Sequence, residues 1–245
     1  MNKFKYPLVF VHGMWVAKWV FVPLMLSLKA LGYECHAFDL RGHGDGKQVK
    51  DLGRVSIYDY VDDVNEFLAD LGRPCVLIGW SMGALIAALV AKDNPSVKAY
   101  VGIASAPHRW TGMTSEVMKN IWSYILDMFS WRSIRLSNQH ARLLMGNTLP
   151  EYVFKEAVSM LQPESGRVAL RIATLSYNVG KLDCPALVIG FKDDNIVCGQ
   201  RKIAHNLGAE YEEVAGCHLS ILEDANRRGC REVCRIIDEW QRRKF

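Results

Sequence analysis

One serine interrupts the longest uncharged stretch of this chain, residues 75–91, and a glycine lies two residues away on each side of it. The pattern is Gly79-Trp80-Ser81-Met82-Gly83, or G-x-S-x-G. The apolar run before Ser81 has the length of a buried strand, and the run after it, rich in alanine and leucine, is typical of a buried helix. Small residues at 79 and 83 let this strand and helix pass close together, so the serine stands on a sharp turn. The motif predicts an exposed hydroxyl, and Ser81 is the candidate nucleophile.

The rest of the chain alternates between strand-like and helix-like segments. This alternation favours a mostly parallel sheet of about six strands with helices on both faces, an α/β fold. Besides the strand before Ser81, we expect strands at 7–11, 33–40, 97–105, 185–191 and 210–214. Besides the helix after Ser81, we expect helices at 19–31, 57–71, 197–207 and 225–243, the first two ended by glycines.

The regular alternation stops between residues 107 and 181. This segment shows no clear strand and is rich in Trp, Met, Phe and Tyr, so we interpret it as several helices inserted into the fold as a lid or cap. The expected organisation is an α/β core at 1–106 and 182–245 with a helical cap at 107–181. Most bulky cap residues are expected to pack the cap itself. The residues predicted to contact substrate are Trp15, Trp80, Trp110, Trp122, Met128, Phe129 and Leu219.

Composition narrows the classes of function. The chain has 245 residues, 50% of them hydrophobic and 23% charged, which is ordinary for one globular domain. Its net charge of +4 is mild, and acidic residues interleave with the basic ones near the C-terminus. That pattern indicates a solvated helix face rather than a nucleic-acid interface.

The seven cysteines are scattered and form no C-x-x-C pair. We therefore expect reduced thiols, no metal site and a cytoplasmic location. The N-terminal residues lack the features of a signal peptide, and the glycine–serine break splits residues 75–91 into a strand and a helix. No membrane-spanning segment is expected.

A serine hydroxyl needs a base within hydrogen-bond reach and a carboxylate that orients the base. His218 follows the last expected strand in a glycine-containing loop, at the sheet edge where Ser81 is expected, and is the candidate base. His108 is a weaker alternative that could reach the pocket. The histidines expected to be structural or surface residues are His36, His140 and His205.

Two adjacent aspartates follow the expected strand at 185–191, and one of them should orient His218. The spacing D-x-I-V favours Asp194, whereas a count of four from Gly190 selects Asp193. Both remain candidates, with Asp194 preferred.

An ester carbonyl that is attacked by serine develops an oxyanion, which backbone N–H groups can stabilise. Met82 supplies one such group because it follows the nucleophile. The second should come from the turn after the first strand, where Met14 is the first choice and Trp15 the reserve. His12, at the start of this turn, is expected to order the loop rather than to move protons.

Five motifs together resemble the α/β-hydrolase fold family along essentially the whole chain. They are His12-Gly13, Asp39-Leu40-Arg41-Gly42-His43-Gly44, the G-x-S-x-G pentapeptide, the Asp193-Asp194 loop and Cys217-His218. The chain order of serine, acid and histidine also fits this family. The early first strand is similar to that of its short esterase and methylesterase-like branch. The resemblance implies a serine esterase with a helical cap and no cofactor.

The same positions argue against some members of this fold. Haloalkane dehalogenases and epoxide hydrolases carry aspartate, and dienelactone hydrolases cysteine, where this chain has Ser81. Hydroxynitrile lyases of the short branch carry lysine after the histidine, where this chain has Leu219. Cys198 in place of a common proline and Ala84 in place of a frequent glycine depart from the family pattern without removing a catalytic group.

The sequence thus predicts a carboxylic ester hydrolase that acts through an acyl-enzyme on small to medium, apolar or aromatic acyl esters. Thioesterase and lactonase activities share this chemistry. A non-catalytic ligand-binding receptor or pseudoenzyme is the alternative of another class. The expected partner is a small-molecule ester, without nucleic acid or stable membrane insertion, for a monomer or homodimer.

Overall fold

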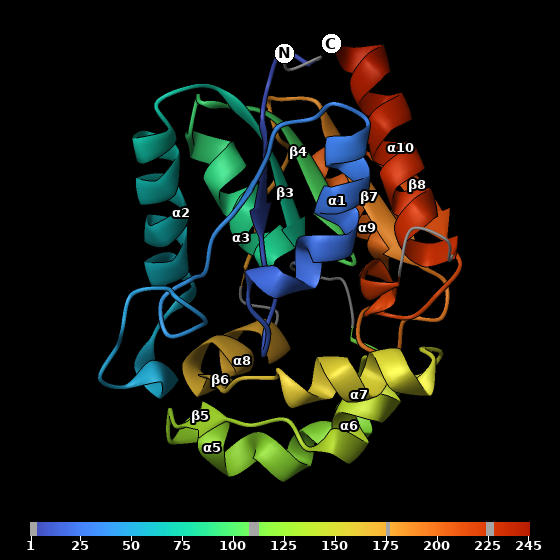
Figure 1. The fold of residues 1–245 in the computed structure, drawn as a ribbon. Helices are drawn as coiled ribbons and strands as arrows, with labels where there is room; N and C mark the ends of the chain where they lie inside the picture. The colour runs from blue at the N-terminus through green and yellow to red at the C-terminus, as the bar shows by residue number, and fades with distance from the viewer. Residues whose placement is uncertain (1–3, 108–112, 175–176, 224–227) are drawn as a thin grey trace.

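Six parallel strands form the central sheet of this computed structural model, which describes residues 4–107, 113–174, 177–223 and 228–245 (Figure 1). Their order across the sheet is β2-β1-β3-β4-β7-β8, so the strand that leads to Ser81, β3, lies inside the sheet. The expected α/β fold is confirmed. The strands are β1 (Leu8–Val11), β2 (Cys35–Ala37), β3 (Cys75–Trp80), β4 (Val97–Ile103), β7 (Ala186–Phe191) and β8 (Glu210–Val214).

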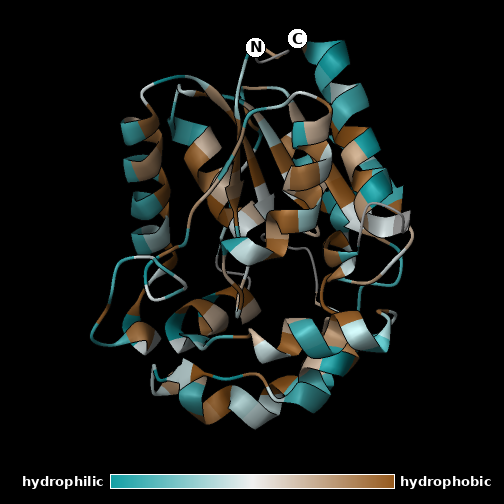
Figure 2. Ribbon diagram, in the orientation of Figure 1, coloured by the Kyte–Doolittle hydropathy of each residue, from teal (hydrophilic) through white to brown (hydrophobic). Residues whose placement is uncertain are grey.

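The sheet divides the buried interior into two clusters, because successive side chains of a strand point to opposite faces. Leu8 and Phe10 of β1 belong to the cluster that includes residues of α1 and α10, whereas Val9 and Val11 belong to the cluster that includes residues of α2, α3 and α9. Figure 2 shows these helices alternating between apolar and polar residues around mostly apolar strands. The helices are α1 (Val22–Ala30), α2 (Ile57–Leu71), α3 (Met82–Asp93), α9 (Gln200–Leu207) and α10 (Arg228–Lys244), with short 3-10 turns η1 (Lys18–Phe21), η2 (Leu52–Arg54) and η4 (Ser220–Leu222).

Element boundaries agree best where the chain carries an end signal. Helix α2 spans the expected residues because Ser56 and Asp59 form a capping box at its start and Gly72 ends it with φ 65°. The expected strand at 33–40 shortens to β2, and the expected helix at 19–31 divides into η1 and α1. Helix α9 begins at Gln200 rather than 197, after Gly199 in the left-handed region.

The long insertion between β4 and β7 lies across the carboxyl ends of the strands, away from both termini (Figure 1). We call its described residues, 113–174, the cap. Its elements are α4 (Ser115–Asn120), η3 (Ile121–Tyr124), α5 (Ile125–Phe129), β5 (Ser133–Ile134), α6 (Asn138–Leu144), α7 (Glu151–Ser159), β6 (Glu164–Ser165) and α8 (Gly166–Ala173). The expectation of a segment without strands was wrong, because β5 and β6 form an antiparallel pair. Strands of two residues are too short to produce an alternating pattern.

Two glycines allow β3, α3 and β1 to meet at the turn that carries Ser81. A Cβ atom on Gly79 would lie 2.2 Å from the carbonyl oxygen of Gly83. A Cβ atom on Gly83 would lie 2.1 Å from the carbonyl oxygen of Val11. Both distances are far inside van der Waals contact with backbone, so no side chain fits at either position.

We therefore expect Gly79→Ala to lower the free energy of unfolding by about 2–3 kcal/mol, the cost typical of overpacking a rigid site. The control is Gly72→Ala, where φ is positive, unlike at Gly79, but the nearest atom to a Cβ is 3.9 Å away. This control should cost only about 1 kcal/mol of backbone strain. Urea unfolding measures both values, and equal losses would contradict the packing argument.

Candidate active site

Ser81 occupies a strained backbone conformation at the end of β3. Its φ of 57° and ψ of −123° lie in a region that residues with a side chain rarely adopt. Neighbouring backbone holds the turn in place: the Ser81 N–H donates to the Ile103 carbonyl at 2.9 Å, and the Ser81 carbonyl accepts from the Ala106 N–H at 2.9 Å. The serine hydroxyl is thereby presented above the carboxyl edge of the sheet.

His218 lies within hydrogen-bond distance of both Ser81 and one aspartate. Its Nδ1 is 2.7 Å from Asp194 Oδ2, and its Nε2 is 2.9 Å from Ser81 Oγ. An ionised carboxylate only accepts, so Nδ1 carries the proton and Nε2 is free to accept from the serine hydroxyl. This arrangement can increase the nucleophilicity of a serine hydroxyl.

The two candidate aspartates have different environments. The Asp194 carboxylate is 1% exposed, and its Oδ1 accepts hydrogen bonds from the N–H groups of Ile196 and Val197. Asp193 is exposed and joins the surrounding loops through its backbone, with its N–H donating to the Gly216 carbonyl. The structure thus brings Asp194, not Asp193, to His218.

The backbone segments that carry the proposed oxyanion donors, Met14 and Met82, lie close to Ser81. Met82 is the first residue of α3, so its N–H has no acceptor within the helix. The loop after β1 approaches Ser81 so closely that a Cβ atom on Gly13 would lie 2.8 Å from the Ser81 Cβ. Met14 follows in this loop, and Trp15 has a positive φ of 64°. Backbone from two elements, the loop after β1 and the start of α3, therefore lies beside Ser81.

His12 orders this loop, as expected. Its Nε2 accepts a hydrogen bond from the Leu40 N–H at 3.0 Å, and its Nδ1 lies 2.9 Å from the Gly13 carbonyl oxygen. Burial, together with the neighbouring His43, lowers the pKa of His12 to about 4. The ring is therefore neutral near pH 7 and its nitrogens are already in use.

An apolar cavity opens beside Ser81 and His218, between the core and the cap. It measures about 800 Å³ with its mouth included. None of the described residues that line it is Asp, Glu, Lys or Arg. Its wall combines side chains from the 13–15 loop, from the loops after β4 and β7, and from the cap helices. The cap residues with the strongest helical spacing are Val117, Ile121, Tyr124 and Met128.

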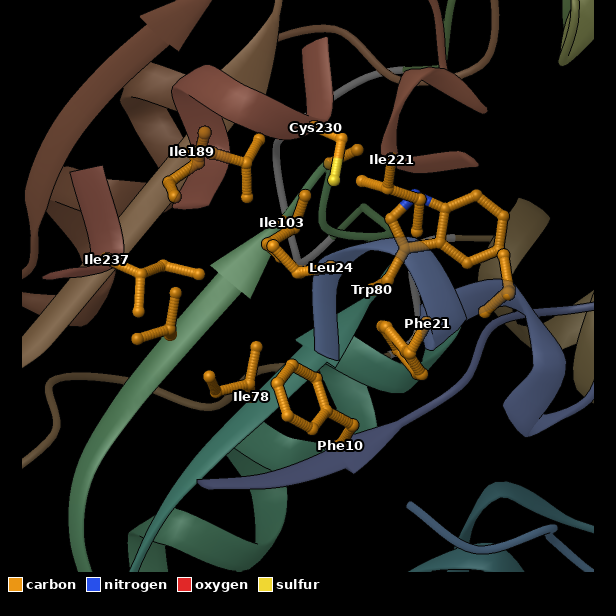
Figure 3. Packing of buried hydrophobic residues seen from close by; sticks show 14 of the residues in the cluster. Phe10, Phe21, Leu24, Ile78, Trp80, Ile103, Ile189, Ile221, Cys230 and Ile237 are labelled. Carbon is orange, nitrogen blue, oxygen red and sulfur yellow. The ribbon is translucent and has the colours of Figure 1, made fainter. Parts of the chain in front are cut away.

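The predicted substrate contacts that fall within the described residues divide into three groups: lining, buried and exposed. Trp15 and Met128 line the cavity. Trp80 and Leu219 do not, because both are buried in the core at 0% and 1% exposure. Figure 3 shows Trp80 among apolar core side chains. Its indole N–H donates to the His218 carbonyl at 3.0 Å, so Trp80 contacts the back of the histidine loop.

Two cap aromatics point away from the cavity. Trp122 and Phe129 are 71% and 67% exposed and are absent from its lining. Each directly follows a lining residue, so the helix rotation places it outside the wall. The repeat at 117, 121, 124 and 128 is the signal that could have found the lining residues. Trp110 and His108 lie outside the described residues.

Neither a metal site nor a membrane span is found in the described part of the chain. No group of three or more His, Cys, Asp or Glu side chains there could hold a metal ion. Within the same residues, no helix is long and apolar enough to cross a bilayer.

The chain belongs to the alpha/beta hydrolase family, whose sequence pattern matches residues 8–230. It is 27% identical over 225 residues to a pimeloyl-[acyl-carrier protein] methyl ester esterase from Proteus mirabilis, covering 84% of this chain and 80% of that protein. Its fold is similar to that of a lipase-esterase related protein from Clostridium acetobutylicum, with a TM-score of 0.75, 21% identity and coverage of 98% and 96%. A soluble variant of monoglyceride lipase from Saccharomyces cerevisiae gives a TM-score of 0.78 at 20% identity, with coverage of 98% and 87%. The expected family is confirmed, and these relatives support a carboxylesterase-like hydrolase.

The different environments of the two aspartates lead to a direct test. Asp194→Asn should lower kcat for p-nitrophenyl acetate by about 10,000-fold, because an amide no longer holds the histidine in the tautomer that accepts the serine proton. Asp193→Asn, the matched control one residue away, should stay within about twofold of the unchanged protein, since only its backbone joins the site. Equal losses from both substitutions would contradict the assignment of Asp194.

Proposed function

We propose that this chain is a serine carboxylesterase in which Ser81, His218 and Asp194 form the catalytic triad. The observation that carries the proposal is the continuous hydrogen-bonded series from Asp194 through His218 to a strained Ser81 at the wall of an apolar cavity. Each neighbouring pair is already within the distance that proton transfer needs.

In the acylation step, Ser81 Oγ bonds to the ester carbonyl carbon while its proton passes to His218 Nε2. The carbonyl π electrons move to oxygen, and the Met14 and Met82 N–H groups stabilise this oxyanion. When the C=O bond re-forms, the C–O bond to the alcohol breaks, and the leaving oxygen takes the proton from Nε2. Asp194 accepts the Nδ1–H throughout and stabilises the imidazolium.

In the deacylation step, water attacks the acyl-enzyme in the same way. His218 Nε2 removes a proton from the water, and the new oxyanion faces the same two N–H groups. Its collapse breaks the bond between Ser81 Oγ and the acyl carbon, releases the carboxylic acid and returns the proton to the serine.

The cavity indicates which esters fit. Its wall is apolar and carries no formal charge among the described residues, so a charged acyl group would lose its hydration without gaining a partner. Its cap-derived side supports our assignment of 107–181 as a substrate-selecting cap. The Proteus mirabilis relative is named for a methyl ester on an acyl chain, which makes uncharged acyl methyl esters suitable test substrates.

Labelling tests whether Ser81 is the nucleophile. A fluorescent phosphonate should attach to the unchanged protein at one residue, Ser81, and a p-nitrophenyl ester should release a stoichiometric burst of p-nitrophenol. Ser81→Ala should abolish both and lower kcat roughly a million-fold. An unlabelled, correctly folded protein would support the ligand-binding alternative.

Acyl-group preference tests the cavity. The kcat/KM for p-nitrophenyl butyrate and p-nitrophenyl benzoate should be at least about 100-fold above that for p-nitrophenyl hemisuccinate, which is of similar size. The reason is that leaving the succinyl carboxylate unpaired in the cavity costs several kcal/mol. A thioester and a lactone of matched acyl size complete the panel. A rate that rises steadily toward long acyl chains, or one equal for charged and neutral acyl groups, would contradict this substrate class.

A further inference from the structure

Two buried charged side chains face each other across the boundary between cap and core. They are Glu164, on β6 of the cap, and His43, in the turn after β2. His43 Nε2 and Glu164 Oε2 are 3.3 Å apart, and both side chains are 0% exposed. Within the described residues neither of these two atoms has a hydrogen-bond partner, and the contact between them is an ion pair when His43 is protonated. The other carboxylate oxygen, Glu164 Oε1, accepts from the Tyr60 hydroxyl at 2.7 Å and from the Ser165 N–H at 2.6 Å.

Each member of this pair favours the charged form of the other. Burial opposes each charge, but the facing partner outweighs it: the pKa of His43 is raised and the pKa of Glu164 is lowered. The attraction within a buried ion pair is largely offset by desolvation. Such a pair is therefore a weak source of net stability, but it joins β6 of the cap to the turn after β2.

The same cap segment is bonded to the loop that holds Met14. The Gln162 N–H donates to the Trp15 carbonyl at 2.8 Å, and Gln162 Oε1 accepts from the Gly44 N–H at 2.9 Å. Residue 162 thus links the loop after β1 to the turn after β2. Trp15 has a φ of 64°, a conformation that persists only where surrounding contacts hold it.

A second route joins the ion pair to this loop. The ring of His43 lies edge-on to the ring of His12, with centroids 5.2 Å apart. His12 directly precedes Gly13, and its Nε2 accepts from the Leu40 N–H just before the turn that carries His43. Displacement of His43 would therefore disturb the start of the loop. Loss of the Gln162 side chain would detach from Gly44 the cap segment whose backbone N–H holds the end of the loop at the Trp15 carbonyl.

We propose that Gln162 and Glu164 are positioning residues that hold the 13–15 loop in the geometry its Met14 N–H needs to stabilise the oxyanion. This inference rests on the proposed esterase function. The cap then has two roles: its helices line the cavity, and its 162–165 segment holds the 13–15 loop of the core in place. Loss of the second role should lower kcat and leave substrate binding unchanged.

The test uses the full chain and four variants. Gln162→Leu removes the acceptor for Gly44, Gln162→Glu keeps an acceptor of the same length, and Glu164→Gln removes the buried negative charge. Gln139→Leu makes the same change as Gln162→Leu on the exposed surface of α6 and is the matched control. Active-site titration with a phosphonate normalises each kcat to the competent protein, and thermal melting reports the stability of each variant.

Gln162→Leu should lower kcat for p-nitrophenyl butyrate about 10- to 100-fold, with KM within about twofold, and Gln162→Glu should recover most of the loss. The dissociation constant of a trifluoromethyl ketone, whose hemiketal oxygen mimics the oxyanion, should rise by the same factor as kcat/KM falls. Glu164→Gln should also lower kcat. Gln139→Leu should change neither value.

A purely structural role for the segment would lower the melting temperature while the kcat of the titrated sites and the ketone affinity stay at their original values. That result for Gln162→Leu would overturn this inference and leave the esterase intact. If the protein without substitutions neither hydrolyses esters nor becomes labelled at Ser81, the proposed function is overturned, and this inference with it.

Discussion

The geometry of the candidate active site depends on a backbone turn in which the peptide groups of neighbouring elements touch without a side chain between them. Ser81 has a positive φ, and Gly79 and Gly83 let β3, α3 and β1 approach without an intervening side chain. Strain of this kind costs about 1–3 kcal/mol and persists only where the surroundings over-determine the conformation. Here a central strand, flanked on both sides, supplies that support. The position of the hydroxyl is therefore a property of the whole sheet.

The other members of the candidate site reach Ser81 through the rule that parallel strands share one carboxyl edge. Asp194 follows β7 and His218 follows β8, so two loops far apart in sequence meet at the same edge. The sequence points to Asp194 because it stands just after the apolar run of β7. Strand β8 is mostly polar, so His218 is indicated instead by the order of the elements and by its glycine-containing loop. The preference for Asp194 over Asp193 rests on a spacing pattern, and its physical basis is that two backbone N–H groups hold the carboxylate.

The structure of the cap is less predictable from the sequence than that of the core. Its helices are short, and its two strands have two residues each, so no periodic signal spans them. The size of Trp122 and Phe129 suggests substrate contact, yet the rotation of the helix, not the size of the side chain, decides which residues face the cavity. Trp80 illustrates a related limit, because a bulky residue beside a nucleophile can equally well belong to the core. Its indole N–H bonds to the carbonyl of His218, a tertiary contact with no local sequence signature.

Among the described residues, the cavity is lined without charged side chains, whereas the region behind the 13–15 loop holds two buried ionisable ones, His43 and Glu164. Placed in the cavity, such a pair would compete with the oxyanion for donors and would select charged substrates. Behind the loop it can direct backbone geometry without contacting substrate. Because one cap segment contacts that loop while the cap helices form the cavity wall, changes that remodel the cap for a new ester are constrained at residues 162–165. Variation between relatives in substrate preference should therefore concentrate in α4 and α5. Helix α6 is constrained as well, because its Leu143 carbonyl accepts from Asn195, beside Asp194, and the Met145 carbonyl that follows it accepts from the Leu219 N–H, beside His218.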